Sequence, residues 1–324
     1  MESREVTLTV PLSITVRIGN GAPMATGSGQ VTSAGVEEAA HPRSYYEGYK
    51  GYIPEFLEII VPLPTLTEEQ RRNAAKNSDA VEGEDPTILP YTHFSVVMNR
   101  RRQLAYYTVV NIDGSQTTDV PRGDDHWFFD SRIAESEQIG EALYRRNALD
   151  RGHLVRRLDP VWGPQAGRAN DDTFHFTNCS PQHERFNQGQ DLWQGLENYI
   201  LDNADARDRK VTVFTGPVMD EWDPLYKGIR LPLAFWKIIA YVKADGTLAT
   251  AGYVLEQGKL IEDMLSFEAV FEPGAYRVEL THLKERTGLD FDYLKAGELP
   301  LSSDGLEAVR DRVRIREDYR NLSL

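Results

Sequence analysis

The amino-acid sequence predicts an α+β fold, because strand-like and helix-like patterns are interspersed along its 324 residues. Apolar and β-branched runs typical of antiparallel strands dominate from residue 94 onward. Helical patterns interrupt them. The clearest spans residues 191–204, where five large apolar side chains share one face: Leu192, Trp193, Leu196, Tyr199 and Ile200. No apolar run approaches the roughly 18 residues that a membrane span needs, so an integral membrane protein is excluded.

The N-terminal segment has its own pattern. Residues 6–18 alternate apolar and mostly polar side chains without a break, which predicts a β-strand that Pro11 places at an edge or divides in two. Residues 19–35 are rich in Gly, Ala, Ser and Thr, as flexible linkers are. We therefore separate a strand and linker at residues 1–36 from a domain at residues 37–324. The strand either folds back onto the main sheet or pairs with another chain or a second copy, and the sequence favours neither.

The domain begins near Ser44 with an aromatic segment that contains Tyr45, Tyr46, Tyr49, Tyr52 and Phe56. We expect helices at residues 133–147, 191–204 and 278–286, and a short helix with a solvated loop within residues 67–88. We expect strands at residues 94–98, 103–111, 211–214, 236–242 and 250–255, with turns at residues 99–102 and 244–246.

Composition limits the class of protein. The single cysteine, Cys179, excludes an internal disulfide framework and a cysteine-built zinc site. Glu2 and Glu5 stand where a signal peptide carries positive charge, so we expect a cytoplasmic protein. The 50 acidic and 36 basic side chains give a net charge of −14. This charge is uneven, since residues 96–170 hold 11 basic and 10 acidic side chains, and it does not exclude a polyanionic ligand there.

Three ordered motifs carry the chemistry. They are Asp150-Arg151-Gly152-His153, then Thr177-Asn178-Cys179-Ser180-Pro181-Gln182, then Phe186-Asn187-Gln188-Gly189 with Glu197 shortly after. On these motifs and their spacing, the chain resembles the DNA/RNA non-specific endonuclease family, the endonuclease G-like, ββα-metal nucleases, over roughly residues 45–295. The resemblance implies a central antiparallel sheet flanked by helices, and hydrolysis of phosphodiester bonds in DNA and RNA with little sequence specificity.

The resemblance also assigns roles. His153 would be the general base that takes a proton from water, since histidine is the side chain whose ordinary pKa suits that task near neutral pH. Asn187 would be the direct protein ligand of one Mg²⁺, which Mn²⁺ could replace, with waters completing the coordination. Arg151 would bind the phosphate, because a guanidinium matches two phosphate oxygens. Because the chain is acidic overall, we expect productive binding to depend strongly on the metal.

Other roles are less directly fixed. Asn178 would hold the geometry of the site, and Glu197 would contact the water shell of the metal. On one straight helix Asn187 and Glu197 would be ~15 Å apart, and a helix that begins near residue 191 would shorten that gap. A further phosphate-binding arginine has two candidates, Arg122 and Arg132.

Alternative interpretations compete with these. Cys179 and His153 could form a nucleophilic pair, although the family leaves position 179 variable. His126, His175 and His183 lack the spacing of a zinc site. The chain could also be a catalytically silent nuclease fold that binds nucleic acid or a protein. As a nuclease it could be a regulated effector in a defence or toxin-like system, recruited to a partner through residues 6–18.

Overall fold

The computed structural model describes residues 39–123, 125–205, 209–265, 274–301, 308–309 and 312–314. The strand expected at residues 6–18 and the linker at residues 19–35 lie outside the described residues. The separation of residues 1–36 from the domain therefore stays a prediction. Residues 38–324 form one compact unit, and the site is built within it.

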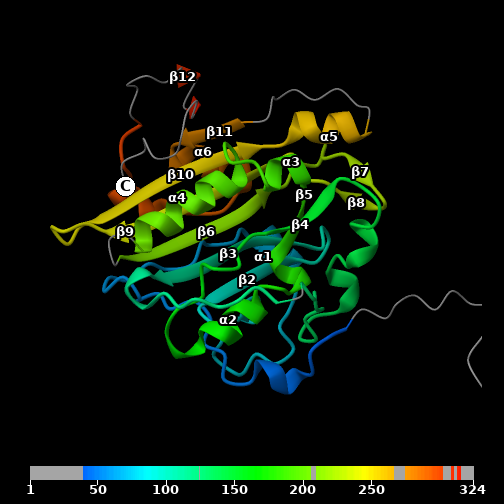
Figure 1. Ribbon diagram of the computed structural model, residues 1–324, viewed down its shortest axis with the longest axis horizontal. Helices are drawn as coiled ribbons and strands as arrows, with labels where there is room; N and C mark the ends of the chain where they lie inside the picture. Colours follow the sequence, from blue (N-terminus) through cyan, green and yellow to red (C-terminus); the bar gives the residue numbers. More distant parts are fainter. Residues whose placement is uncertain are drawn as a thin grey trace, which may run out of the picture. The chain divides into compact units, whose positions relative to one another are not determined.

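A nine-stranded sheet forms the centre of this unit (Figure 1). All of its pairings are antiparallel. In spatial order its strands are β1 (Leu89–Pro90), β2 (Phe94–Asn99), β3 (Leu104–Asp113), β6 (Lys210–Val218), β9 (Ala234–Val242), β10 (Leu248–Glu256), β11 (Gly274–Val278), β13 (Arg312–Arg314) and β12 (Ala308–Val309). The five strands expected between residues 94 and 255 are all present. So is the turn at residues 244–246, where Gly246 has φ +80°.

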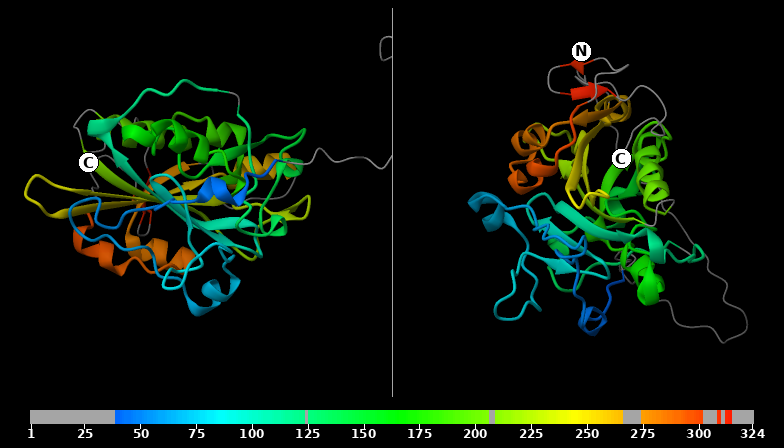
Figure 2. Two further views of the ribbon diagram at one scale, coloured as in Figure 1. Left: turned by 90° about the horizontal axis from the view of Figure 1, so that it is seen from below. Right: turned by 90° about the vertical axis from the view of Figure 1, so that its left-hand side faces the viewer.

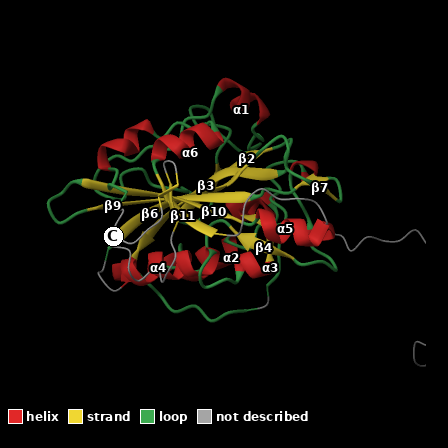
Figure 3. Ribbon diagram, turned by 90° about the horizontal axis from the view of Figure 1, so that it is seen from above, coloured by secondary structure: helices red, strands yellow, loops and turns green. Residues whose placement is uncertain are grey.

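Helices cover both faces of this sheet (Figures 2 and 3). They are α1 (Glu68–Asn73), α2 (Ala166–Asp172), α3 (Glu184–Asn187), α4 (Trp193–Asp205), α5 (Gly258–Leu265) and α6 (Leu280–Thr287). α6 lies on one face and α4 on the other (Figure 3). α1 begins where Thr67 and Gln70 form a capping box, which satisfies backbone N–H groups that a helix start leaves free. The α+β prediction is confirmed.

Strand alternation divides the core between the two faces. On β9, Trp236 and Ile238 pack in a cluster with Leu280 and Leu283 of α6. Phe235 and Ile239 pack in a second cluster with Trp193 and Leu196 of α4. Because successive side chains of a strand point to opposite faces, Lys237 points toward α4, into an otherwise apolar layer.

A separate hairpin, β4 (Leu149–His153) with β5 (Cys179–His183), stands outside the large sheet. The side chain of Gln257, fully buried, fastens it to the rest of the unit. Its Oε1 accepts from the backbone N–H of His183 at 2.8 Å, and its Nε2 donates to the carbonyl oxygens of Pro181 at 3.2 Å and Pro232 at 2.7 Å. A smaller hairpin joins β7 (Leu225–Tyr226) and β8 (Ile229–Arg230).

The prediction of a helix at residues 133–147 is wrong. The structure has only two 3₁₀ turns in that range, Glu135–Glu137 and Glu141–Leu143. Gly140 lies between them, and Arg146 has φ +56°, which no α-helix accommodates. The Gln138 side chain bonds the backbone of Asp130 through both its oxygen and its nitrogen, so this segment is held by a side chain and not by a helical ladder.

Among the described residues, no helix combines the length and the apolar character that a membrane span needs.

Candidate active site

The hairpin and the helix after it bring the three sequence motifs together. The pairing of β4 with β5 places Gly152 opposite Ser180 and His153 opposite Cys179, so the first motif lies against the second. The third motif follows directly, because α3 starts at Glu184. Position 152 needs a glycine because the side chain of Gln182 packs against its backbone, and a Cβ there would lie 2.0 Å from Oε1 of Gln182.

A pocket of about 710 Å³ opens beside this hairpin. Six of the residues singled out in the sequence line it: Arg122, Asp150, Arg151, His153, Asn187 and Glu197. Its remaining walls include Asp125, Trp127, Arg156, Arg157 and Phe174. Two expected site residues, Asn178 and Arg132, do not line it.

His153 is half-buried between aromatic rings. Its ring centroid lies 4.7 Å from that of Trp127 and 5.1 Å from that of Phe174. Its Nε2 is buried and makes no hydrogen bond within the described part of the chain. Burial, aided by the nearby Arg122, Arg157 and Arg151, lowers the pKa of His153 to about 3, although Asp125 opposes the shift. The imidazole is therefore neutral at neutral pH.

Arg151 extends into the same pocket. Its Nη1 donates to the carboxylate of Glu141, and its guanidinium carbon lies 5.6 Å from the centre of the Trp127 ring. Its side chain is 30% exposed, so the guanidinium is accessible to an anion in the pocket.

Asp150 orients Asn187. The Asn187 amide nitrogen donates to Oδ2 of Asp150 at 2.9 Å, and Gln188 Nε2 donates to the same oxygen at 2.9 Å. Because its nitrogen is committed to Asp150, the carbonyl oxygen of Asn187 is the end left as a possible metal ligand. No group of three His, Cys, Asp or Glu side chains suited to a metal occurs among the described residues. A site with few protein oxygens fits Mg²⁺, which keeps most of its waters, and does not fit a closed zinc site.

Glu197 reaches the same pocket from a different helix. α3 ends at Asn187 and α4 begins at Trp193, so the two residues are not on one straight helix, and the loop between them allows both to line the pocket. Glu197 is 8% exposed, and burial raises its pKa, although Lys237 and Arg156 oppose the shift. Its Oε1 lies 3.4 Å from Nζ of Lys237.

Asn178 acts on the backbone and not in the pocket. It is fully buried. Its Nδ2 donates to the carbonyl oxygens of Val155 and Thr173 at 3.0 Å each, and its Oδ1 accepts from the Val155 N–H at 2.9 Å. The amide thereby fixes the chain two residues beyond His153. This is a structural role, and the structure does not bring Asn178 to the reacting groups.

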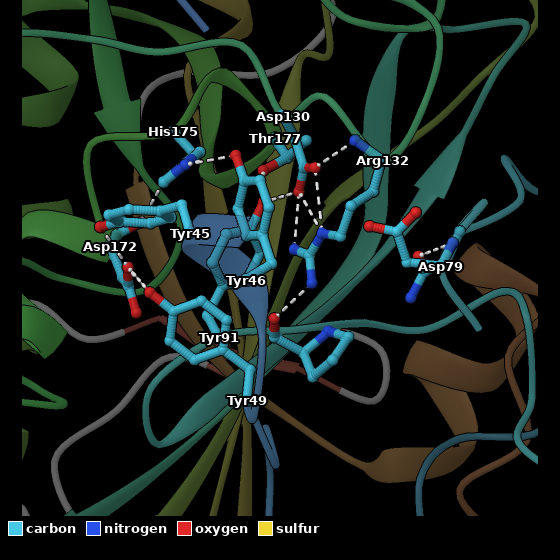
Figure 4. Close-up of polar contacts among 12 residues, drawn as sticks. Tyr45, Tyr46, Tyr49, Asp79, Tyr91, Asp130, Arg132, Asp172, His175 and Thr177 are labelled. Carbon is cyan, nitrogen blue, oxygen red and sulfur yellow. Dashed lines mark hydrogen bonds and ion pairs between the residues drawn. The ribbon is translucent and has the colours of Figure 1, made fainter. Parts of the chain in front are cut away.

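The two candidate arginines differ. Arg122 lines the pocket, its side chain is 69% exposed, and it pairs with Asp125. Arg132 is 2% exposed and is bound to Asp130 in an interior polar cluster (Figure 4). Its guanidinium also lies 4.0 Å from the centre of the Tyr46 ring and donates to the carbonyl oxygen of Pro90. The expectation that Arg132 binds phosphate is therefore corrected, because its donors face partners inside the protein.

The cysteine and histidine alternatives find no support in the geometry. Cys179 is buried, lies outside the pocket lining, and contacts the hydroxyl of Tyr144 at 3.5 Å. His175 is buried between Tyr46 and the backbone of Asp172.

Sequence reasoning missed three basic residues at or beside the site. Arg156 and Arg157 line the pocket, and Arg157 also lines an adjoining pocket of about 480 Å³, which His41, Tyr45 and Phe128 line as well. Lys237 is fully buried beside Glu197. A sequence signal existed for Lys237, because it is the one charge in an otherwise apolar run, Ala234–Val242, which predicts a central strand.

Comparisons with known proteins identify similar chains. Residues 72–296 match the family described as DNA/RNA non-specific endonuclease. The chain is 44% identical over 268 residues to uncharacterized protein y4fB of Sinorhizobium fredii, and the match covers 78% of this chain and 40% of that protein. It is 26% identical over 145 residues to the mitochondrial endonuclease G of Bos taurus, and this match covers 41% of this chain and 46% of that protein. The chain thus spans less than half the length of these relatives.

A solved structure has a similar fold. It is the crystal structure of the EndoG/EndoGI complex, with a TM-score of 0.51 and 19% sequence identity. The match covers 72% of this chain and 94% of that chain.

Proposed function

Because this chain belongs to the DNA/RNA non-specific endonuclease family, we propose that it is a Mg²⁺-dependent endonuclease that hydrolyses phosphodiester bonds of DNA and RNA. One observation carries the proposal. Asp150, Arg151, His153, Asn187 and Glu197 come from separate motifs and line one pocket. The pocket combines a neutral base, guanidinium groups and carboxylate and amide oxygens, which are the groups that attack of water on a phosphodiester requires.

His153 would accept the proton of the attacking water. Its ring is held by Trp127 and Phe174, and its Nε2, which bonds none of the described residues, would take the proton. Arg151 would bind the phosphate and offset the charge that develops on its oxygens. The carbonyl oxygen of Asn187, oriented by Asp150, and the carboxylate of Glu197 would hold the metal and its waters. A Mg²⁺ held there, or a Mn²⁺ in its place, would supply a Lewis acid to the phosphate and to the departing oxygen.

Low sequence specificity follows from the same groups. Guanidinium contacts with phosphate position a nucleic acid but do not distinguish its bases. The adjoining pocket shares Arg157 and Phe174 with the site, and the rings of Tyr45 and Phe128 that also line it could contact any base. We therefore propose that both DNA and RNA are substrates.

The test is cleavage of plasmid DNA and of a labelled RNA by the purified protein with Mg²⁺, with EDTA and with the His153→Ala variant. We expect cleavage with Mg²⁺, its loss in EDTA, and a fall in kcat of about 10²–10⁴-fold in the variant. His282→Ala, on α6 at the opposite face of the sheet, is the matched control and should retain activity. Cleavage that survives His153→Ala would remove the proposed base. A wild-type protein that cleaves neither nucleic acid would favour a catalytically silent fold.

A regulated role is a further part of the proposal. A non-specific nuclease in the cytoplasm meets the nucleic acids of its own cell, which is the reason to propose recruitment through residues 6–18 into a defence or toxin-like system. Deletion of residues 1–36, assayed by light scattering and by cleavage, tests it. Unchanged mass, partner binding and activity would contradict it.

A further inference from the structure

We propose that Lys237 is a positioning residue that ties the carboxylate of Glu197 to the backbone following His153. The inference rests on the proposed function for the reaction, and it adds to the site a residue that lies outside all three motifs. Lys237 belongs to β9 in the middle of the large sheet, while Glu197 belongs to α4 and His153 to the separate hairpin.

The three protons of the Lys237 ammonium face three acceptors. Nζ lies 3.4 Å from the carbonyl oxygen of Leu154, 3.2 Å from Oγ1 of Thr215, and 3.4 Å from Oε1 of Glu197. These acceptors belong to the residue after β4, to β6 and to α4. One side chain thus connects the sheet with α4 and with the residue that follows β4, two of the elements that bring groups to the pocket.

The surroundings leave the ammonium few other partners. Lys237 is fully buried, and its Nζ lies 4.2 Å from the centre of the Trp193 ring, one turn before Glu197 on α4. The ring face is attracted to the cation and also excludes water from it. Asp159, 4% exposed, and the half-buried Arg156 are the other charged side chains acting on this ammonium.

Packing alone does not explain a lysine here. Removing an ammonium from water costs several kcal/mol, and an apolar side chain of similar size fills such a position without that cost. The other residues of Ala234–Val242 are all apolar or aromatic. Burial of the lysine is therefore costly, and its polar contacts lead to Glu197, to Thr215 and to the backbone at Leu154, with the charge of Asp159 nearby.

A second buried cation in the same sheet provides the control. Arg277 of β11 is 8% exposed, and its guanidinium lies 5.4 Å from the centre of the Tyr253 ring. It donates to the carbonyl oxygens of Gly252, Val278 and Leu299, and it does not line the pocket. Its loss removes a buried cation and an aromatic contact, as the loss of Lys237 does, but leaves Glu197 untouched.

The experiment compares Lys237→Met with Arg277→Met in the full chain. Urea unfolding measures stability, Mn²⁺ titration followed by electron paramagnetic resonance measures metal binding without substrate, and plasmid cleavage gives kcat and KM. For Lys237→Met we expect a 10–100-fold loss in kcat or Mn²⁺ affinity, with KM for DNA changed by less than about threefold. Arg277→Met should lose stability but keep both properties. Equal kcat and Mn²⁺ affinity in the two variants would overturn the inference.

Two more variants test whether Lys237 acts through Glu197. Lys237→Arg retains a cation and should restore part of the Mn²⁺ affinity. In a Glu197→Gln background, Lys237→Met should cause less than about a threefold further loss, because the group through which Lys237 acts is already altered. A full further loss there would show that Lys237 does not act through Glu197. A wild-type protein that binds Mn²⁺ but cleaves nothing contradicts the proposed function alone, and one that does neither contradicts both.

Discussion

Two polar regions of this molecule differ in how completely their atoms are paired. In the interior cluster of Figure 4, Arg132 donates to Asp130, Asp130 also accepts from Tyr91, and the Tyr91 hydroxyl bonds Thr177 at 2.7 Å. In the pocket, Nε2 of His153 and Nε of Arg151 are buried without a hydrogen bond to the described residues. The polar groups of this paired cluster bond one another, so they contribute to stability alone. The pocket keeps polar atoms that can still bond water, a metal or a phosphate.

The pKa values of the titratable groups also differ between the interior cluster and the pocket. Burial opposes the charge of Asp130, but Arg132 and the hydrogen bonds outweigh burial and hold its pKa below the ordinary value. At His153 burial prevails, and the pKa falls. Asp130 is thus kept charged by its partners, and His153 is kept neutral by burial, which is the state from which a general base accepts a proton.

The largest effect should come from breaking the paired cluster. Arg132→Met leaves the carboxylate of Asp130 buried and uncompensated, so we expect the free energy of unfolding in urea to fall by about 3–5 kcal/mol. The kcat of the molecules that remain folded should change little. His153→Ala should show the reverse, with a large loss of kcat and a stability change below about 1 kcal/mol. Equal stability losses in the two variants would contradict the comparison.

A smaller effect should follow from releasing Asn187. Asp150→Asn replaces the oxygen that accepts from Asn187 and Gln188 with a group that can also donate. We expect the Mg²⁺ concentration for half-maximal cleavage to rise about 10-fold or more. Gln188→Ala, which leaves the bond between Asp150 and Asn187 intact, should raise it less. An unchanged Mg²⁺ requirement in Asp150→Asn would show that Asp150 does not orient the ligand.

The smallest effect concerns pH. The pKa of His153 is lowered from 6.5 to about 3, so its neutral, proton-accepting form persists as the pH falls through 6.5. The acidic limb of kcat/KM, which reports the free enzyme, should therefore lie below pH ~5. Measurement of kcat/KM from pH 4.5 to 8 checks this. A midpoint near 6.5 would indicate an unperturbed histidine.

The sequence carried the fold and most of the site for different reasons. The strands were predictable because alternation and β-branched runs are local signals. The motifs at 150–153 and 186–189, whose residues line the pocket, could be singled out because their spacing resembles that of a family. Residues 133–147 were mispredicted because Ile133, Ile139 and Leu143 face the core without helical bonds, a result of tertiary contacts that no local pattern records.

Contacts between residues far apart in the chain decide the questions about the site that the sequence leaves open. Arg122 and Arg132 look equivalent along the chain, and only the fold places Asp130 and Tyr46 around Arg132. The separation of Asn187 and Glu197 depended on where the helix begins, and the structure puts that start at Trp193. Lys237 was missed because it lies 40 residues after Glu197 in a segment whose pattern indicates a strand and no chemistry.

The attachment of the β4–β5 hairpin has a consequence for protein engineering. Residues 149–189 contain all three motifs and look like a module that could be transplanted to another scaffold. Yet the hairpin is held to its surroundings by the buried amide of Gln257, which bonds His183, Pro181 and Pro232 from a position about 70 residues further on. A transplant therefore needs an equivalent amide in its new host, although Gln257 takes no part in the chemistry.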